Sequence, residues 1–253
     1  GRRRDESDVR EERERLEHGG GGSMARTVMI YRELPVRRGM STATIIALHG
    51  HGGDLDQLEP LCRVLGQSLE VVMPQAPRPV NPGRILDKPE AYQGYAWYFT
   101  HKVGYPEPAT FGDCLWQVEQ FVYDVLDRQS VERPLFLLGY DQGAVLAVTM
   151  AGVVPQSLAG VVAIRGYLPE IGGWSLPVEN VAALPVLLVH DPHDAEIPTA
   201  LVQKTAEDLC RRSATVDLRE IPAARRDPLA AAEVLSEWLG AQLGNESSRE
   251  RGG

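Results

Sequence analysis

The sequence is poor in cysteine. Its 253 residues include three cysteines, Cys62, Cys114 and Cys210, which lie far apart in the chain. An odd number of distant cysteines is not a disulfide framework, and the spacing is not that of a metal site. We therefore expect buried, reduced thiols in a cytoplasmic protein, with no bound metal.

Positive charge and long hydrophobic runs are also scarce. The chain has 26 lysines and arginines against 35 aspartates and glutamates, a formal net charge of -9. Nucleic-acid-binding proteins generally present a basic surface, so nucleic acid is not an expected partner. No apolar stretch reaches the length that a membrane-spanning helix needs. A small molecule is the expected partner, and the sequence leaves the oligomeric state open.

Both ends of the chain predict tails. Residues 2–17 are almost all charged and residues 19–23 (GGGGS) spell a glycine-rich linker, so we expect residues 1–23 to be disordered. Residues 245–253 form a second polar segment, which predicts a disordered tail. Residues 24–244 have the length of one domain.

Within this domain, short apolar runs alternate with longer helical patterns. The runs that predict strands are residues 27–31, 42–48, 69–73, 135–138, 161–164, 186–189 and 215–221. The patterns that predict helices are residues 58–65, 113–126, 142–150, 199–211 and 229–243. Apolar strands separated by helices predict an α/β fold, a mostly parallel central sheet with helices on both faces. Ligands bind such sheets at the carboxyl ends of the strands.

Two glycine-rich turns follow predicted strands. Residues 49–54 (HGHGGD) form the first, where backbone N–H groups facing a ligand would make an oxyanion hole; an ordinary tight turn has the same composition. Residues 139–144 (GYDQGA) form the second, in the strand–turn–helix context of a nucleophile elbow, G-x-S-x-G. The central residue is Asp141, which could equally serve as a helix N-cap.

A third turn, residues 190–194 (HDPHD), places Asp194 where the acid of a hydrolase triad belongs. The order of the two positions, nucleophile and then acid, is that of the α/β-hydrolases. A triad also needs a histidine after the last strand, but residues 222–228 (PAARRDP) contain none. No histidine of the chain follows Asp194.

Taken together, these segments resemble the phospholipase/carboxylesterase family, to which acyl-protein thioesterases belong. The resemblance rests on LHGHGGD (48–54), PQAPRP (74–79), WYF (97–99), LLGYDQGA (137–144), RGYLP (165–169) and the acid turn. It implies an α/β-hydrolase fold and a Ser-His-Asp esterase without a cofactor.

The resemblance maps the nucleophile onto Asp141 and the acid onto Asp194. It maps the oxyanion donors onto the N–H groups of His51 and Gln142, and the histidine near Ala224 or Arg225. A serine esterase needs a hydroxyl group and a histidine that deprotonates it, and Asp141 supplies neither. We therefore expect a degraded triad without serine-type esterase activity.

Three functions stay open. The first is a degraded esterase that keeps a small-molecule pocket. The second is a hydrolase with Asp141 as nucleophile, as in epoxide hydrolases and haloalkane dehalogenases, which would need His51 or His193 to activate water. The third is an enzyme of another class that uses the pocket without a covalent step.

The strand ends that converge at the elbow predict a pocket there. We expect the largest pocket of the protein to open above Asp141. Its walls are expected to come from His51, Gln142, Trp97 and Tyr98.

Arginines are expected to take the place of the missing histidine. Asp141 and Asp194 would be two carboxylates in a semi-enclosed site, which is costly without a cation. Arg225 stands about where the histidine should be, and Arg165 ends the strand expected beside the elbow strand. We expect Arg225, or its neighbour Arg226, to reach one of the two carboxylates, and Arg165 to lie near Asp141.

Overall fold

The computed structural model of the chain describes residues 29–36, 39, 41–66, 68–80, 94–172, 181 and 183–250. The segment 1–23, expected to be a disordered tail, lies outside these ranges.

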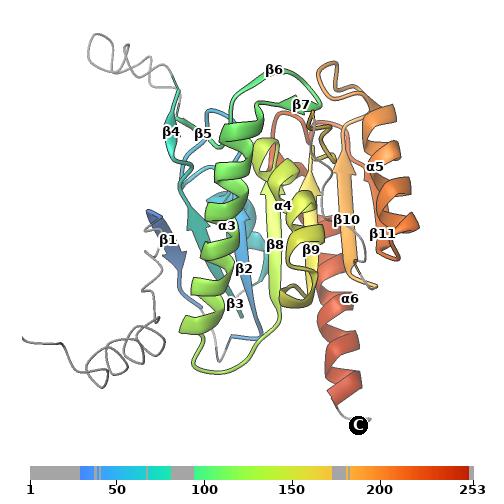
Figure 1. The fold of residues 1–253 in the computed structure, drawn as a ribbon. Helices are drawn as coiled ribbons and strands as arrows, with labels where there is room; N and C mark the ends of the chain where they lie inside the picture. The colour runs from blue at the N-terminus through green and yellow to red at the C-terminus, as the bar shows by residue number, and fades with distance from the viewer. Residues whose placement is uncertain are drawn as a thin grey trace, which may run out of the picture.

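Seven strands form the central sheet (Figure 1). They are β1 (Tyr31–Leu34), β2 (Ala43–Leu48), β3 (Leu69–Pro74), β8 (Leu135–Tyr140), β9 (Gly160–Ile164), β10 (Pro185–His190) and β11 (Thr215–Glu220). Their order is β1-β3-β2-β8-β9-β10-β11, and β1 runs antiparallel to β3 while the other neighbours are parallel. Every residue of β2, β8 and β9 is buried, which explains their continuous apolar sequences.

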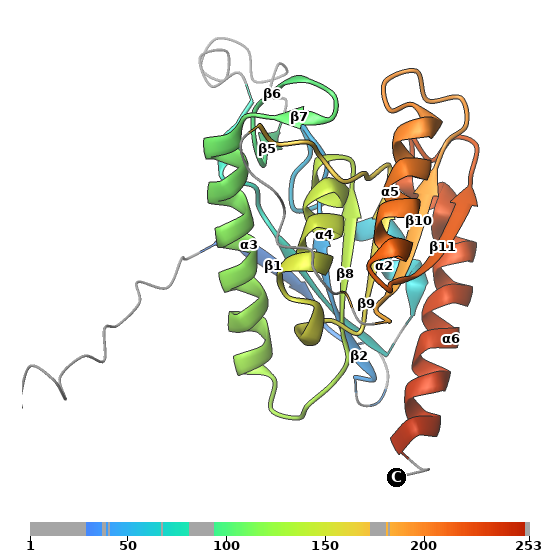
Figure 2. The same ribbon diagram turned by 45° about the vertical axis from the view of Figure 1, so that its right-hand side comes forward.

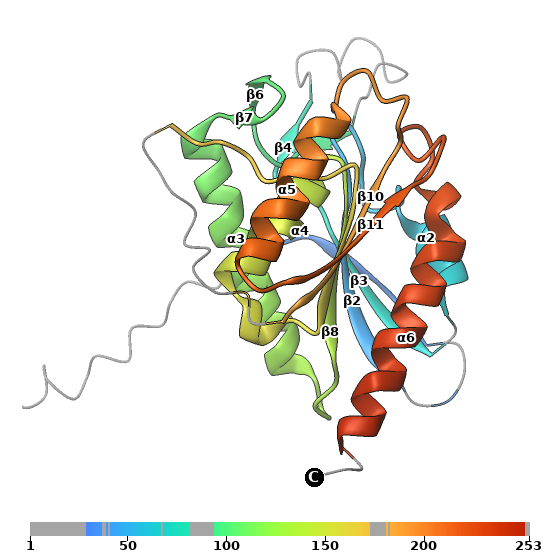
Figure 3. The same cartoon turned by 90° about the vertical axis from the view of Figure 1, so that its right-hand side faces the viewer.

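Five α-helices of the described chain flank the sheet. They are α2 (Glu59–Leu65), α3 (Pro108–Arg128), α4 (Gln142–Val153), α5 (Thr199–Arg211) and α6 (Ala232–Glu250). Figures 2 and 3 show α3, α4 and α5 on one face of the sheet and α2 and α6 on the other. The predicted fold class is therefore confirmed. None of the described helices is long and apolar enough to cross a bilayer.

Shorter elements complete the structure. Short 3₁₀ helices lie at η3 (Pro155–Ser157) and η4 (Pro228–Ala231). Two small sheets, β4 (Arg78–Pro79) with β5 (Tyr95–Ala96) and β6 (Thr100–Lys102) with β7 (Tyr105–Pro106), were not predicted. The short β6–β7 turn arches over the end of the sheet in Figure 1.

Several predicted boundaries were wrong. The first strand spans Tyr31–Leu34, whereas residues 27–31 were expected to form it. Helix α3 begins at Pro108 instead of residue 113, because the Glu107 side chain caps it by accepting hydrogen bonds from the amides of Ala109 and Thr110. Helix α6 continues to Glu250, into the segment expected to be a disordered tail, and no proline interrupts it.

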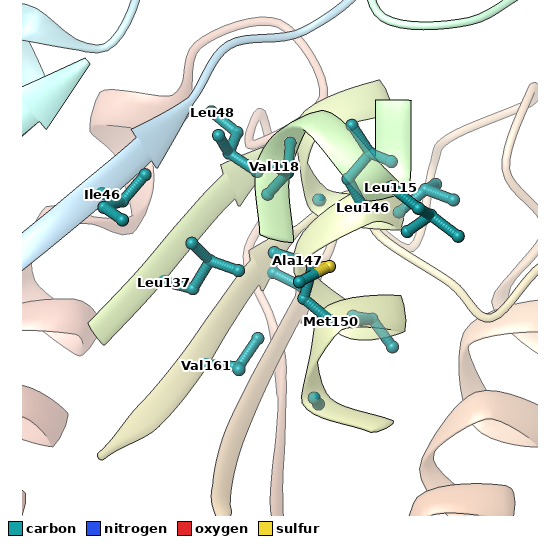
Figure 4. Packing of buried hydrophobic residues seen from close by; sticks show 14 of the residues in the cluster. Ile46, Leu48, Leu115, Val118, Leu137, Leu146, Ala147, Met150 and Val161 are labelled. Atoms are coloured by element: carbon teal, nitrogen blue, oxygen red, sulfur yellow. The ribbon is translucent and has the colours of Figure 1, made fainter. Parts of the chain in front are cut away.

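Helix α4 is buried on nearly all sides, which fixes the turn that precedes it. Eleven of its residues, from Gln142 to Gly152, are buried, as expected for a helix that is apolar all round. Figure 4 shows the packing: side chains of α4 lie between the sheet and α3. The labelled side chains belong to one core cluster: Leu146, Ala147 and Met150 of α4, Leu48, Leu137 and Val161 of the sheet, and Leu115 and Val118 of α3.

Two glycines let α4 approach the strands closely. A Cβ atom on Gly143 would lie 2.1 Å from the carbonyl oxygen of Leu48, and one on Gly139 would lie 2.2 Å from that of Gly143. Backbone atoms cannot yield like the end of a flexible side chain, so both positions require glycine. The two glycines flank Asp141 and set its height above the sheet.

This packing predicts that Gly143→Ala lowers the free energy of unfolding by roughly 1–3 kcal/mol or more, through overpacking against backbone. Urea denaturation measures the loss. The matched control is Gly112→Ala in α3, where a Cβ atom would meet nothing within 4 Å. That variant should be neutral, or stabilise by up to about 1 kcal/mol through its helix propensity. Equal losses in both variants would contradict the assigned contact.

Candidate functional site

Asp141 joins β8 to α4 in a strained backbone conformation. Its φ is 51° and its ψ is −118°, a region that side-chain-bearing residues rarely adopt. Its amide donates to the carbonyl of Ile164 at 3.0 Å, and its own carbonyl accepts from the amides of Ala144 and Val145. Asp141 is therefore the N-cap residue of α4, as the sequence allowed, but its side chain makes no capping hydrogen bond to the helix.

The Asp141 carboxylate is held on both of its oxygens. Oδ2 accepts a hydrogen bond from the backbone N–H of His51 at 2.9 Å, and Oδ1 accepts one from Nη1 of Arg165 at 3.0 Å. The first contact joins the elbow to the glycine-rich turn after β2. It uses one of the two N–H groups expected to form an oxyanion hole. The second, that of Gln142, is the first amide of α4 and therefore has no acceptor within the helix.

Arg165 is the centre of the site. It follows β9 with a φ of 66°, and its amide donates to the carbonyl of Val189 at 2.8 Å. Its half-buried guanidinium forms ion pairs with Asp141, Asp194 and Glu196. It donates two hydrogen bonds to the Asp194 carboxylate. Burial opposes the charge, but the Asp194 hydrogen bonds and the nearby carboxylates outweigh it and raise the guanidinium pKa above its usual value. The predicted proximity of Arg165 to Asp141 is confirmed.

Asp194 lies in the loop between β10 and α5, with a side chain that is 3% exposed. Besides Arg165, the amides of Glu196 and Ile197 donate to Oδ1 at 2.9 and 3.2 Å. Burial raises the pKa of this carboxyl, but the hydrogen bonds from Arg165 and the two amides lower the pKa by a larger amount. The net pKa of Asp194 therefore lies below its ordinary value. Asp194 is therefore an ionised, buried partner of Arg165.

The prediction for Arg225 was wrong. Its Nε lies 3.4 Å from Oδ2 of Asp191, not beside Asp141 or Asp194. The reason is the register of β10 and β11, which pairs His190 with Glu220 and places the following loop beside Asp191. Asp191 also accepts from the amides of His193 and Ala223, each at 2.9 Å. The neighbouring Arg226 is exposed.

A cavity of about 440 Å³ opens above Asp141, and Asp194 is not part of its lining. Its lining includes Asp141 and the predicted His51, Tyr98 and Gln142, together with Thr100, Val103, Val145, Arg165, Tyr167, Glu196 and Ile197. A second cavity, between β11 and α6, measures about 500 Å³, so the expectation that the site holds the largest pocket was wrong. Sequence reasoning missed Val103 and Glu196; the latter could have been suspected because it lies only two residues after Asp194.

Trp97 does not line this cavity, contrary to prediction. Its side chain is fully buried, and its indole N–H donates to the carbonyl of His49 at 2.7 Å, which turns the ring away from the site. The Gln142 side chain holds this segment by accepting from the Trp97 amide at 3.0 Å and donating to the Tyr98 carbonyl at 2.9 Å.

Two histidines, His49 and His51, belong to the turn beside the elbow. Buried His49 donates from Nδ1 to the Gly50 carbonyl at 2.8 Å and accepts the Ala76 amide on Nε2 at 3.0 Å. Burial lowers its pKa to about 4, so it is neutral and structural. His51 contacts Asp141 through its backbone. In the part of the chain that the structure describes, no imidazole nitrogen is hydrogen-bonded to Asp141 or Asp194. The same residues contain no group of acidic, histidine or cysteine side chains that could hold a metal ion.

The arrangement of strands and elbow matches a known family. The model of the phospholipase/carboxylesterase family aligns with residues 34–227, well over half of the chain. The chain belongs to this family. The search of curated protein sequences found no match to it.

Solved structures of other proteins share the fold. The carboxylesterase of Mesorhizobium loti has 21% identity and a TM-score of 0.70, over 85% of this chain and 99% of that one. The Bacillus cereus carboxylesterase has 17% identity and a TM-score of 0.72, over 90% and 99%. Zea mays acyl-protein thioesterase 2 has 20% identity and a TM-score of 0.63, over 85% and 100%. At these identities the likeness extends to the fold alone.

The ion pairs at the site predict that Arg165→Met destabilises the protein. The variant keeps most of the bulk but leaves Asp194 buried without its cation. We expect the free energy of unfolding at neutral pH to fall by about 3–5 kcal/mol, measured by urea denaturation. The control is Arg226→Met, an exposed arginine that should change stability by no more than about 0.5 kcal/mol.

The loss should depend on pH. Because folding lowers the Asp194 pKa, the stability it contributes is present above the unfolded pKa of about 3.9 and disappears as the pH falls through the folded value. The difference between wild type and Arg165→Met should therefore be largest at neutral pH and shrink below about pH 4. A difference independent of pH would argue for lost packing alone.

Proposed function

We propose that this family member binds a small molecule in the cavity above Asp141 and has lost serine-type ester hydrolysis. The observation that carries the proposal is the guanidinium of Arg165, which bridges Asp141 and Asp194. The family resemblance gives these two positions to the nucleophile and the acid of a triad. An imidazole would have to stand between them, and a guanidinium stands there instead.

A guanidinium in place of an imidazole removes proton transfer from the site. A triad histidine takes a proton from the nucleophile and returns it to the leaving group. The Arg165 guanidinium cannot take up a proton, because it is already fully protonated and, in proteins, does not lose its charge. Asp141 has no hydroxyl group to activate.

The oxyanion hole is also occupied by the protein itself. The His51 amide, which would stabilise a substrate oxyanion, donates to the Asp141 carboxylate at 2.9 Å. A negative charge therefore already lies where an esterase would develop one in the transition state. An ester carbonyl at this position would meet repulsion where a serine esterase offers stabilisation.

The same contacts argue against Asp141 as a nucleophile. An attacking carboxylate would have to leave both Arg165 and the His51 amide. Hydrolysis of the resulting ester would then need a base to activate water, and the described part of the site offers no imidazole in contact with Asp141. We therefore place the binding function first.

The charges around the cavity indicate what it accepts. Arg165 already pairs with three carboxylates, so it is not available to hold a ligand anion. Those three carboxylates exceed the one guanidinium, while Tyr98, Val145 and Ile197 supply apolar or aromatic surface. The site therefore favours a neutral or cationic ligand with an apolar part, small enough for about 440 Å³.

The proposal predicts no catalytic ester hydrolysis. The purified protein should hydrolyse p-nitrophenyl acetate and butyrate no faster than its Asp141→Ala variant. Fluorophosphonate probes for active serines should leave the elbow peptide unlabelled in mass spectrometry. Turnover that disappears in Asp141→Ala, or a covalent adduct on Asp141 after exposure to an epoxide or haloalkane, would instead establish an aspartate nucleophile.

Ligand binding is predicted to depend on the cavity mouth. In a thermal-shift screen of matched amines, alcohols and carboxylates, we expect hits among the amines and alcohols and none among the carboxylates. Val103→Trp, which narrows the cavity from its rim, should abolish these shifts. Val131→Trp, at an exposed valine outside the cavity, should preserve them. Hits confined to carboxylates, or hits unaffected by Val103→Trp, would refute this assignment of the site.

A further inference from the structure

The outer edge of the sheet at β11 presents unused backbone groups. β11 is the last strand in the sheet order and pairs only with β10 among the described strands. The amides of Thr215 and Ile221 donate toward the β10 side, to the carbonyls of Leu184 and His190 at 3.0 and 2.8 Å. Because successive residues of a strand point to opposite edges, the N–H and C=O groups of residues 216, 218 and 220 point outward. Figure 3 looks onto this edge, with β11 running between α5 and α6.

The sequence of this strand is complementary to itself. In an antiparallel pair of two β11 strands centred on Leu218, Asp217 of one copy lies opposite Arg219 of the other. The outward groups of residues 216, 218 and 220 would form the hydrogen-bonded pairs. Asp217 and Arg219 would then occupy the non-hydrogen-bonded pairs, in which side chains approach most closely. Both side chains are accessible, 40% and 56% exposed, and pairing would form two opposite-charge contacts across the axis.

A groove runs beside this edge on the α6 side. The cavity of about 500 Å³ noted above is lined by Asp217 and Arg219 of β11 and by Val234, Glu237, Trp238, Ala241 and Gln242 of α6. Its acidic residues, Asp217 and Glu237, lie where the Arg219 side chain of a second copy would enter. On the opposite face of β11, Val216 and Leu218 are only partly buried against the core, so a second Leu218 on the axis would cover apolar surface.

We propose that two copies of this chain associate through β11, with the strands antiparallel about a two-fold axis near Leu218. The pairing satisfies an open sheet edge that proteins otherwise protect by other means. It uses none of the residues that line the cavity above Asp141, so that cavity stays open in each copy of the dimer. The proposal is independent of the function proposed for that cavity.

Charge exchange at the edge tests the proposal. Sedimentation velocity on the full chain should show a dimer. Arg219→Asp places like charges opposite each other and should weaken dimerisation about tenfold or more. Asp217→Arg should do the same. A mixture of the two variants restores opposite charges at both pairs and should form the heterodimer. The matched control is Arg32→Asp, an exposed arginine on β1 at the other edge of the sheet, which should stay dimeric.

Asp217 accepts a hydrogen bond from the Trp238 indole at 3.1 Å, so Asp217→Arg could also impair folding. A second measurement therefore avoids this variant. Hydrogen exchange on the wild-type chain should show protection of the amides of residues 216, 218 and 220 that is lost on dilution and in Arg219→Asp. A monomeric wild-type chain overturns the proposal. So does a dimer in which Arg219→Asp changes neither the mass nor the protection of these amides.

Discussion

A buried carboxylate needs a partner for its charge, and this requirement organises the upper end of the sheet. The Asp194 side chain is almost completely removed from solvent, and an ionised group there is stable only if hydrogen bonds and a cation replace water. Arg165 supplies the cation and two backbone amides supply further hydrogen bonds. The same guanidinium then reaches Asp141, so one side chain compensates both acidic positions.

The sheet topology makes this arrangement possible. Asp141 follows β8, Arg165 follows β9 and Asp194 follows β10, and these strands are consecutive neighbours in the sheet. Parallel strands end on the same side, so the three charges converge without any long-range adjustment of loops. Positive φ values at Asp141 and Arg165 show that the backbone is strained to aim both side chains. The packing of α4 against the sheet holds that strain in place.

The sequence was sufficient for the elements that depend on local pattern. Continuous apolar runs located the buried strands, and the glycines around Asp141 located the elbow, because both features follow from burial and close packing. Arg165 was placed correctly since its strand was expected next to the elbow strand. Arg225 was misplaced because counting residues in a loop does not reveal the register of β11 on β10, which directs the loop to Asp191. The direction of Trp97 depends on one hydrogen bond to the His49 carbonyl, which no sequence pattern indicates.

The protein thus keeps the fold of its family and a cavity above Asp141. Beside this cavity, the charge of Arg165 partly neutralises the three carboxylates that it contacts. Arg165 is the partner of the buried acid, and we propose that it stands where a triad would hold histidine. The most direct test is a carbon-13 NMR titration of the aspartate carboxyl groups in wild type and Arg165→Met. We expect the Asp194 pKa to lie below its ordinary value of about 3.9 in the wild type and to rise in the variant. An Asp194 pKa at or above the ordinary value in the wild type, unchanged by the substitution, would contradict it.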